Sequence, residues 1–223
     1  MSIGSVYEIA YKGDFNQVKV KIDQDKSLVS KTDENGRLLI HWAALGGNEN
    51  LVDYLIDCGS PLDPVDDTAS TPLILASSAG RYEVVKLLIN KGANVNHKTN
   101  RRQTSMHYAC SKGHKEIVKL LINSEANVND ADVLGATPLH RAAAQGRSNI
   151  VELLVACSHL KIDPTDSTGS TPLHLACEED REAVACLLVK SGAKTDIENK
   201  EKKTPFDLCS KKLKQSIMNI LKE

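Results

Sequence analysis

The chain repeats one short pattern at an almost constant interval of 33 residues. The pattern is clearest in five phrases, STPLILA, QTSMHYA, ATPLHRA, STPLHLA and KTPFDLC, which begin at Ser70, Gln103, Ala136, Ser170 and Lys203. A weaker copy, RLLIHWA, begins at Arg37, and one period earlier the stretch SVYEIAYKGD fits as a degenerate first copy. A fixed period of about 20 to 50 residues is typical of repeat architectures, so these seven copies predict a stack of small units.

Each copy has the pattern of two helices joined by turns. Thr followed by Pro favours the start of the first helix, because a hydroxyl can cap free amides and Pro is tolerated at the first helical position. The second helix is predicted from an apolar stripe at helical spacing, such as Val84, Val85, Leu87, Leu88 and Ile89. Glycines are expected to end the first helix at Gly47, Gly80, Gly113 and Gly146, and the second at Gly59, Gly92 and Gly192. In two other copies, Glu125 and Ser158 occupy the position at the end of the second helix. The single extra residue of the fifth copy lies near Ser158 and is expected in a loop.

Composition narrows the class of protein. Apolar residues make up 41% of the chain, but only two Phe and one Trp are present, so aliphatic side chains and alanine must supply the packing. Lys and Arg number 28 against 29 Asp and Glu, which argues against nucleic acid as a partner. The sequence lacks the pattern of a secretory signal, and no apolar run approaches the ~18 residues that span a bilayer. We therefore expect a soluble, intracellular protein, with no membrane partner and with six free thiols. The location expected for it is the cytoplasm and nucleus.

The residues that could carry chemistry follow the repeat. One repeat position holds histidine in four copies: His41, His107, His140 and His174. Stacking separates equivalent positions by about 10 Å, too far for ligands that lie ~2 Å from one metal ion, so we predict that each imidazole hydrogen-bonds turn backbone. Three cysteines replace the alanine of other copies and are expected to be buried, namely Cys110, Cys177 and Cys209. No catalytic motif is present, so we predict no enzyme activity, catalytic residue, metal or cofactor.

The repeated T-P-L-H-x-A phrase, followed by glycine and a V-V-x-x-L-L stretch, resembles the ankyrin repeat over essentially the whole chain. The resemblance implies an all-α solenoid of seven stacked helix-turn-helix repeats with β-turn fingers, forming a single domain over residues 1–223. The predicted repeats are approximately 1–33, 34–66, 67–99, 100–132, 133–166, 167–199 and 200–223. Because one unit cannot bury its own apolar face, stability is expected to come from stacking on neighbours.

In an ankyrin stack, the turn tips and the solvent-facing positions of the first helices form a concave binding surface. The variable residues at these positions should carry specificity for a protein partner. Both signs of charge occur there, which suits a folded, charged partner. We expect Trp42 to pack within the chain, and a contact with the partner protein is the second possibility for this residue. The candidate protein-binding residues are Arg37, Trp42, Asp66, Asp67, Arg81, Arg101, Lys112, Glu179, Glu198 and Glu201.

Several phrases go beyond the general repeat, among them DKSL, GRLLIHWA, SAGRYEVVK, PLHLACEEDR and IENKEKKTP. With these phrases and seven repeats, the chain resembles the gankyrin-like proteins. The resemblance implies an assembly chaperone for the base of the proteasome regulatory particle, which cradles the C-terminal domain of an AAA-ATPase subunit. It implies charged contacts at Arg37, Asp67, Arg81, Lys112 and Glu198. The chain departs from the family at Ser70, where the family has a tryptophan, so an aromatic anchor is absent there.

Three further interpretations remain open. Leu175, Cys177 and Glu179 spell L-x-C-x-E, a motif for docking on the retinoblastoma protein, but they also match what the ankyrin template requires. The alternative function is an ankyrin-type inhibitor or regulator of a cyclin-dependent kinase, the retinoblastoma protein or a Rel-type transcription factor. A structural adaptor is a third possibility. We expect a monomer in each case.

Overall fold

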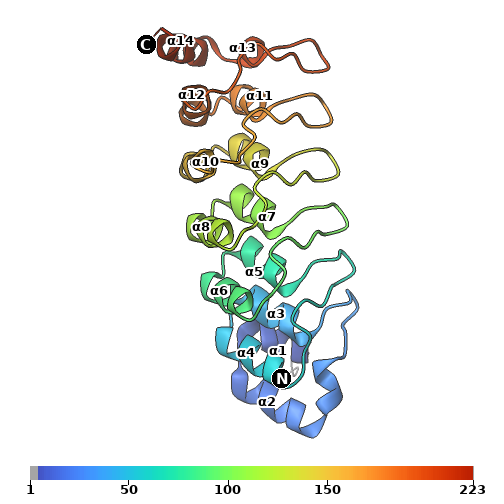
Figure 1. Cartoon of the computed structure of the whole chain (residues 1–223). Helices are drawn as coiled ribbons and strands as arrows, with labels where there is room; N and C mark the ends of the chain where they lie inside the picture. The colour runs from blue at the N-terminus through green and yellow to red at the C-terminus, as the bar shows by residue number, and fades with distance from the viewer. Residues whose placement is uncertain (1–4, 223) are drawn as a thin grey trace. The chain divides into compact units, whose positions relative to one another are not determined.

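The computed structural model describes residues 5–222, which are helical and contain no β-strand. The chain divides into two compact units. The first comprises Met1–Asn100 with Asn123–Glu125, and the second comprises Arg101–Ile122 with Ala126–Glu223. Each unit is a set of helix pairs joined by long turns, as predicted, and the turns all leave the helices on the same side within a unit (Figure 1).

The first unit contains three helix pairs. The first helices α1, α3 and α5 pack side by side, and α2, α4 and α6 follow them in turn (Figure 1). A short 3₁₀ helix after α2, Lys26–Val29, covers part of the DKSL phrase and has no counterpart in the other pairs. The helices span Val6–Lys12, Phe15–Gln24, Leu39–Gly46, Glu49–Asp57, Pro72–Ala79 and Tyr82–Asn90 for α1 to α6.

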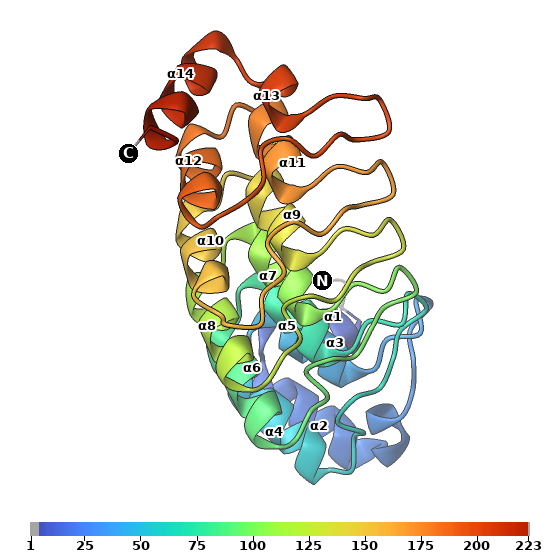
Figure 2. The same ribbon diagram turned by 45° about the horizontal axis from the view of Figure 1, so that its top comes forward.

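The second unit contains four helix pairs in the same arrangement. The first helices α7, α9, α11 and α13 form one row, and α10, α12 and α14 pack in sequence beside it (Figure 2). The helices span Ser105–Lys112, Lys115–Asn123, Pro138–Ala144, Ser148–Val155, Pro172–Glu178, Glu182–Lys190, Pro205–Leu208 and Lys211–Ile220 for α7 to α14.

Small residues let the first helices approach one another closely. Ala43, Ala44, Ala142 and Ala143 have no exposed surface. Of the stripe predicted on α6, Val84, Val85 and Leu88 are fully buried, whereas Leu87 and Ile89 are only half-buried. The buried face of a second helix is therefore narrower than the run of apolar letters suggests, since only positions three and four apart share one face.

Glycine ends three of the first helices as predicted, whereas the fourth predicted glycine, Gly146 with φ of 66°, follows the Gln145 cap of α9. Gly47, Gly80 and Gly113 cap α3, α5 and α7 with φ of 89°, 74° and 83°, in the left-handed region that glycine adopts without strain. Glu125 takes the same conformation at the end of a second helix, with φ of 61°. The extra residue of the fifth repeat lies in the turn after α10, which ends at Val155, so the loop prediction is confirmed.

Five of the fingers close on an acidic or amide side chain, that of Asp33, Asp66, Asp132, Asp166 or Asn199. In the turn Asp66–Ser70, the Asp66 carboxylate accepts hydrogen bonds from the backbone amides of Thr68 and Ser70, both at 2.9 Å. The turn Asp166–Ser170 repeats this arrangement. Neighbouring fingers are joined by a single backbone hydrogen bond, for example from the Asp67 amide to the Asn35 carbonyl at 3.0 Å.

The repeated histidines join consecutive repeats, which confirms the prediction that they hydrogen-bond backbone. Nδ1 of His140 accepts the amide of Thr137 at 3.1 Å, and its Nε2 lies 3.0 Å from the Ser170 carbonyl of the next finger. An imidazole that accepts at Nδ1 and donates from Nε2 is neutral. His41, His107 and His174 make equivalent contacts.

The cysteine predictions hold in two cases of three. Cys110 and Cys177 are buried, but Cys209 is half-buried, so its predicted burial is wrong. The reason is that α13 ends at Leu208, and Cys209 follows in extended backbone with its thiol directed at the Pro205 carbonyl.

Among residues 5–222, no helix has the length and apolar character needed to cross a membrane.

We predict that stability falls between pH 7.5 and 5.5 because of these histidines. Burial lowers the pKa of His107 and His140, which outweighs the effect of their hydrogen bonds to carbonyls. Histidines of the unfolded chain have a pKa near 6.5, so as the pH falls the unfolded chain binds more protons than the folded one. The free energy of unfolding therefore decreases by about 1 kcal/mol for each buried imidazole. Urea unfolding followed by circular dichroism measures this loss. His140→Gln should reduce the pH dependence, and an equal dependence in wild type and variant would contradict the assignment.

We predict that Ala69→Gly stabilises the chain. Ala69 has φ of 58° at the finger position that Gly36, Gly135 and Gly169 occupy in other repeats. Removing the Cβ relieves this left-handed strain, so we expect the free energy of unfolding to rise by up to about 1 kcal/mol. The matched control is Ala183→Gly on the exposed side of α12, which should lower stability by about 0.5 to 1 kcal/mol. A loss of stability in Ala69→Gly would contradict the strain argument.

Candidate protein-binding surface

The predicted contact residues differ widely in exposure. One is buried (Asp66), and two are half-buried (Arg37 and Trp42). The remaining seven are exposed: Asp67, Arg81, Arg101, Lys112, Glu179, Glu198 and Glu201. The exposed residues are distributed over both units, on fingers and around the ends of the first helices.

Asp66 is a structural residue of its finger, and the expectation that it faces solvent is wrong. Its side chain is 1% exposed and accepts four hydrogen bonds, including one from Arg37 Nε at 2.9 Å. Burial raises the pKa of the Asp66 carboxyl, but bonds from Thr68, Ser70 and Arg37 outweigh burial and hold it below its ordinary value. The sequence could not reveal this, because an aspartate at a turn fits a cap and a contact equally well.

Arg37 and Trp42 belong to one cluster in the first unit. The guanidinium carbon of Arg37 lies 5.2 Å from the centre of the Trp42 ring, while Arg37 Nε is bound to Asp66. The indole nitrogen of Trp42 donates to Asp33 at 2.9 Å, and the ring of Tyr11 meets Trp42 edge-on at 6.3 Å. Trp42 therefore packs, as predicted, and Arg37 is held by contacts within the chain.

Arg81 also has an internal partner. Its Nε donates to the Leu45 carbonyl at the end of α3, at 3.1 Å. Arg147 and Arg181 make the equivalent bonds to the Ser111 and Ala144 carbonyls in the second unit. These arginines satisfy carbonyls that a helix leaves free at its C-terminal end. The signal in the sequence was their shared repeat position, directly after Gly80, Gly146 and Asp180.

The second unit has a related cluster that sequence reasoning missed. The buried Asp132 carboxylate pairs closely with Arg141 and also accepts from Gln103 at 3.4 Å. Arg141 occupies the repeat position of Trp42, and both side chains bind the aspartate of their own finger. The adjacent finger tip carries two exposed apolar side chains, Val133 at 54% and Leu134 at 57%.

The predicted acidic contacts of the second unit lie in its last two repeats. Glu198 and Glu201 lie on one finger and pair with Lys202 at 3.5 Å and Lys203 at 2.9 Å, while Glu179 lies 3.6 Å from an Arg181 nitrogen. All of these acidic side chains are more than half exposed. A hollow of about 470 Å³ lies beside them, lined in part by Leu175, Glu178 and Glu201. Exposed ion pairs of this kind contribute little to stability and remain available to a partner.

The L-x-C-x-E segment is helical in this structure. Leu175 and Cys177 lie within α11, and Cys177 is 1% exposed. Glu179 follows the helix and is exposed. A motif that docks as an extended strand cannot do so from this conformation, because the cysteine is part of the core.

In the part of the chain that the structure describes, no group of three or more His, Cys, Asp or Glu side chains is placed to hold a metal.

Comparison with known proteins finds relatives among proteasome subunits. Over 67 residues, the chain is 42% identical to the human 26S proteasome non-ATPase regulatory subunit 10 and 41% identical to the mouse protein of that name. The matched region covers 30% of this chain and 29% to 30% of each relative, so it spans less than a third of their length. The gankyrin-like resemblance of the sequence is supported by these relatives.

Solved structures match over nearly the full chain. The crystal structure of the human ASB11 ankyrin repeat domain superposes with a TM-score of 0.86 at 26% identity, covering 97% of both chains. The ankyrin repeat domain of Bcl-3, a member of the IkappaB protein family, gives a TM-score of 0.82 at 19% identity, which shows the fold alone.

Family models account for most of the sequence. A model of three ankyrin repeats matches residues 6–99 and again 94–168, and a single-repeat model matches residues 168–200. These matches agree with the helix pairs, the left-handed glycines and the buried histidines of both units. The chain belongs to the ankyrin-repeat family.

Proposed function

We propose that this chain is a protein-binding scaffold that recognises the C-terminal domain of a proteasomal AAA-ATPase subunit and assists assembly of the proteasome regulatory particle. In this role the protein acts in the cytoplasm and nucleus. The proposal is supported by the 41% to 42% identity to non-ATPase regulatory subunit 10 over 67 residues. It is also supported by the fold, since ankyrin stacks present variable fingers to protein partners.

The observation that carries the proposal is the array of exposed charges of both signs on the fingers and first helices of the second unit. Arg101 and Lys112 are exposed in its first repeat, and Lys112 lies at the end of α7. In its last two repeats, the exposed carboxylates of Glu178, Glu179, Glu198 and Glu201 lie among exposed cations that include Arg181, Lys202 and Lys203. Such a surface fits a folded partner that carries charges of both signs and presents acidic groups to Arg101 and Lys112, where charge sets orientation and association rate.

The first unit contributes less to such a contact than the sequence suggests. Arg37 is bound to Asp66 and lies over Trp42, and Arg81 caps α3, so both have internal roles. Asp67 is exposed and remains a candidate contact there. The similarity to the Bcl-3 domain is too low to favour a Rel-type regulator, and the helical L-x-C-x-E segment does not favour retinoblastoma binding.

We predict that Arg101→Glu combined with Lys112→Glu weakens binding to the ATPase domain by at least about tenfold, because the reversed charges would face the partner's acidic patch. Both side chains are exposed, so each change should alter stability by less than ~0.5 kcal/mol. The measurement is calorimetric titration with purified C-terminal domains of proteasomal ATPase subunits at low and moderate salt.

The control carries the same charge change on the second helix of the same repeat, as Lys115→Glu with Lys119→Glu on exposed positions of α8. The control should bind like wild type. Equal losses in the two variants would show that the finger side is not the contact surface. Capture of a kinase or transcription factor from cell extract, with no ATPase subunit, would overturn the proposed function.

A further inference from the structure

A pocket of about 500 Å³ opens in the first unit, between α1 and the Asp33–Arg37 finger. The chain has only two Phe, five Tyr and one Trp, yet three of these aromatic side chains line this one pocket. No Lys or Arg is among its described lining residues. The lining is formed by Ser5, Tyr7, Glu8, Tyr11, Asp33, Glu34, Asn35 and Trp42.

Two of the aromatic rings form a corner. Tyr11 and Trp42 meet at an interplanar angle of 89°, with ring centres 6.3 Å apart. Trp42 is held by its hydrogen bond to Asp33, and Tyr11 lies on α1, which packs against α3. Tyr7 is held by its hydroxyl, which donates to the Lys31 carbonyl at 3.2 Å. Electron-rich ring faces in such an arrangement attract cations.

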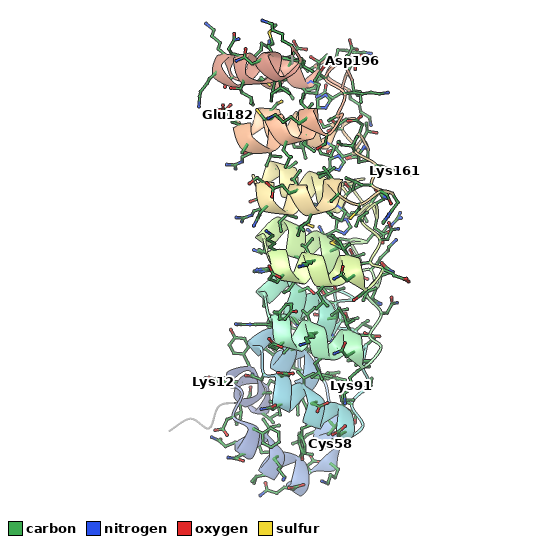
Figure 3. All side chains as sticks on the ribbon, turned by 60° about the vertical axis from the view of Figure 1, so that its left-hand side comes forward. Lys12, Cys58, Lys91, Lys161, Glu182 and Asp196 are labelled. Carbon is green, nitrogen blue, oxygen red and sulfur yellow. The ribbon has the colours of Figure 1, made fainter. Side chains whose placement is uncertain are left out.

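Three carboxylates surround the same space. Asp33 is held ionised, because amide bonds from Arg37 and Asn35 and the indole bond from Trp42 outweigh burial and lower its pKa. Glu8 pairs with Lys12, labelled in Figure 3, at 2.6 Å on the exposed side of α1. Glu34 is exposed and has no hydrogen bond or ion pair to another of residues 5–222. The pocket therefore combines apolar walls with an excess of negative charge.

We propose that this pocket binds an arginine side chain of a partner protein. A guanidinium can stack on one ring while its N–H groups bond to carboxylates, a combination that a quaternary ammonium lacks and a compact lysine ammonium achieves less well. The chain already shows this preference on its own residues, because the Arg37 guanidinium lies 5.2 Å from the centre of Trp42. The Glu34 carboxylate is the free acceptor, and Tyr11 and Trp42 are the walls.

This inference does not depend on which protein the chain binds, because it rests on the pocket alone. It is tested with a small probe and without a partner. Trp42 is the single tryptophan, so its indole N–H gives one resonance and its fluorescence reports on this pocket alone.

The experiment titrates the full chain with the peptide acetyl-Gly-Arg-Gly-amide up to about 10 mM at constant ionic strength, since one side-chain contact corresponds to a millimolar Kd. The matched control peptide carries citrulline, which has the shape of arginine but no charge. We expect a saturable shift of the Trp42 indole signal with the arginine peptide, and binding at least about tenfold weaker with citrulline, because the cation and its ionic hydrogen bonds are lost.

Two variants test the residues. Glu34→Gln keeps the shape of the side chain and should weaken arginine binding about two- to fivefold, as expected for one exposed ion pair. Glu83→Gln, on the exposed side of α6, should leave binding unchanged. The proposal is overturned if citrulline binds as well as arginine, if a lysine or trimethyl-lysine peptide binds more tightly, if Glu34→Gln has no effect, or if the arginine peptide leaves the Trp42 signal unmoved.

Discussion

Much of the stack depends on one kind of buried hydrogen-bonded group, the imidazole at the start of the four first helices α3, α7, α9 and α11. In the second unit, Nδ1 of His140 accepts from the Thr137 amide, and its Nε2 bonds to the Ser170 carbonyl of the following finger. One side chain thereby caps its own helix and fixes the next repeat, both inside the core. Packing of alanine and aliphatic side chains supplies the main apolar stabilisation, but it is not directional. The imidazole fixes the register in which one helix pair meets the next.

Most of the fold could be predicted from the sequence, because the repeat places the same residue in the same environment several times. The glycines at Gly47, Gly80 and Gly113, the histidines and the loop after α10 all follow from position in the repeat. The prediction failed at Cys209, where the last first helix is only four residues long and the template no longer applies. Local helix length depends on packing at that site, which a repeat pattern does not contain.

The candidate surface was harder to predict than the fold. A charged residue in the sequence of a finger indicates a polar position, but the side chain can contact solvent, another protein or the chain itself. Asp66, Arg37 and Arg81 all proved to have partners within the chain. Lys112, by contrast, is exposed at the end of α7, and Glu198 is exposed and pairs with Lys202 of its own finger. Comparing what each position does in every repeat separates the two groups, and this requires coordinates.

The single backbone bond between neighbouring fingers has a consequence for how such a surface can change over time. The Asp67 amide bonds to the Asn35 carbonyl, and the Ser167 amide bonds to the Leu134 carbonyl, without using any side chain. The link is therefore indifferent to the amino acid at the tip, which is acidic at Asp67, apolar at Leu134 and hydroxylated at Ser167. Tip residues can be exchanged one at a time while the fingers stay aligned. A lineage can thus acquire a new partner by gradual substitution, without passing through an unfolded intermediate.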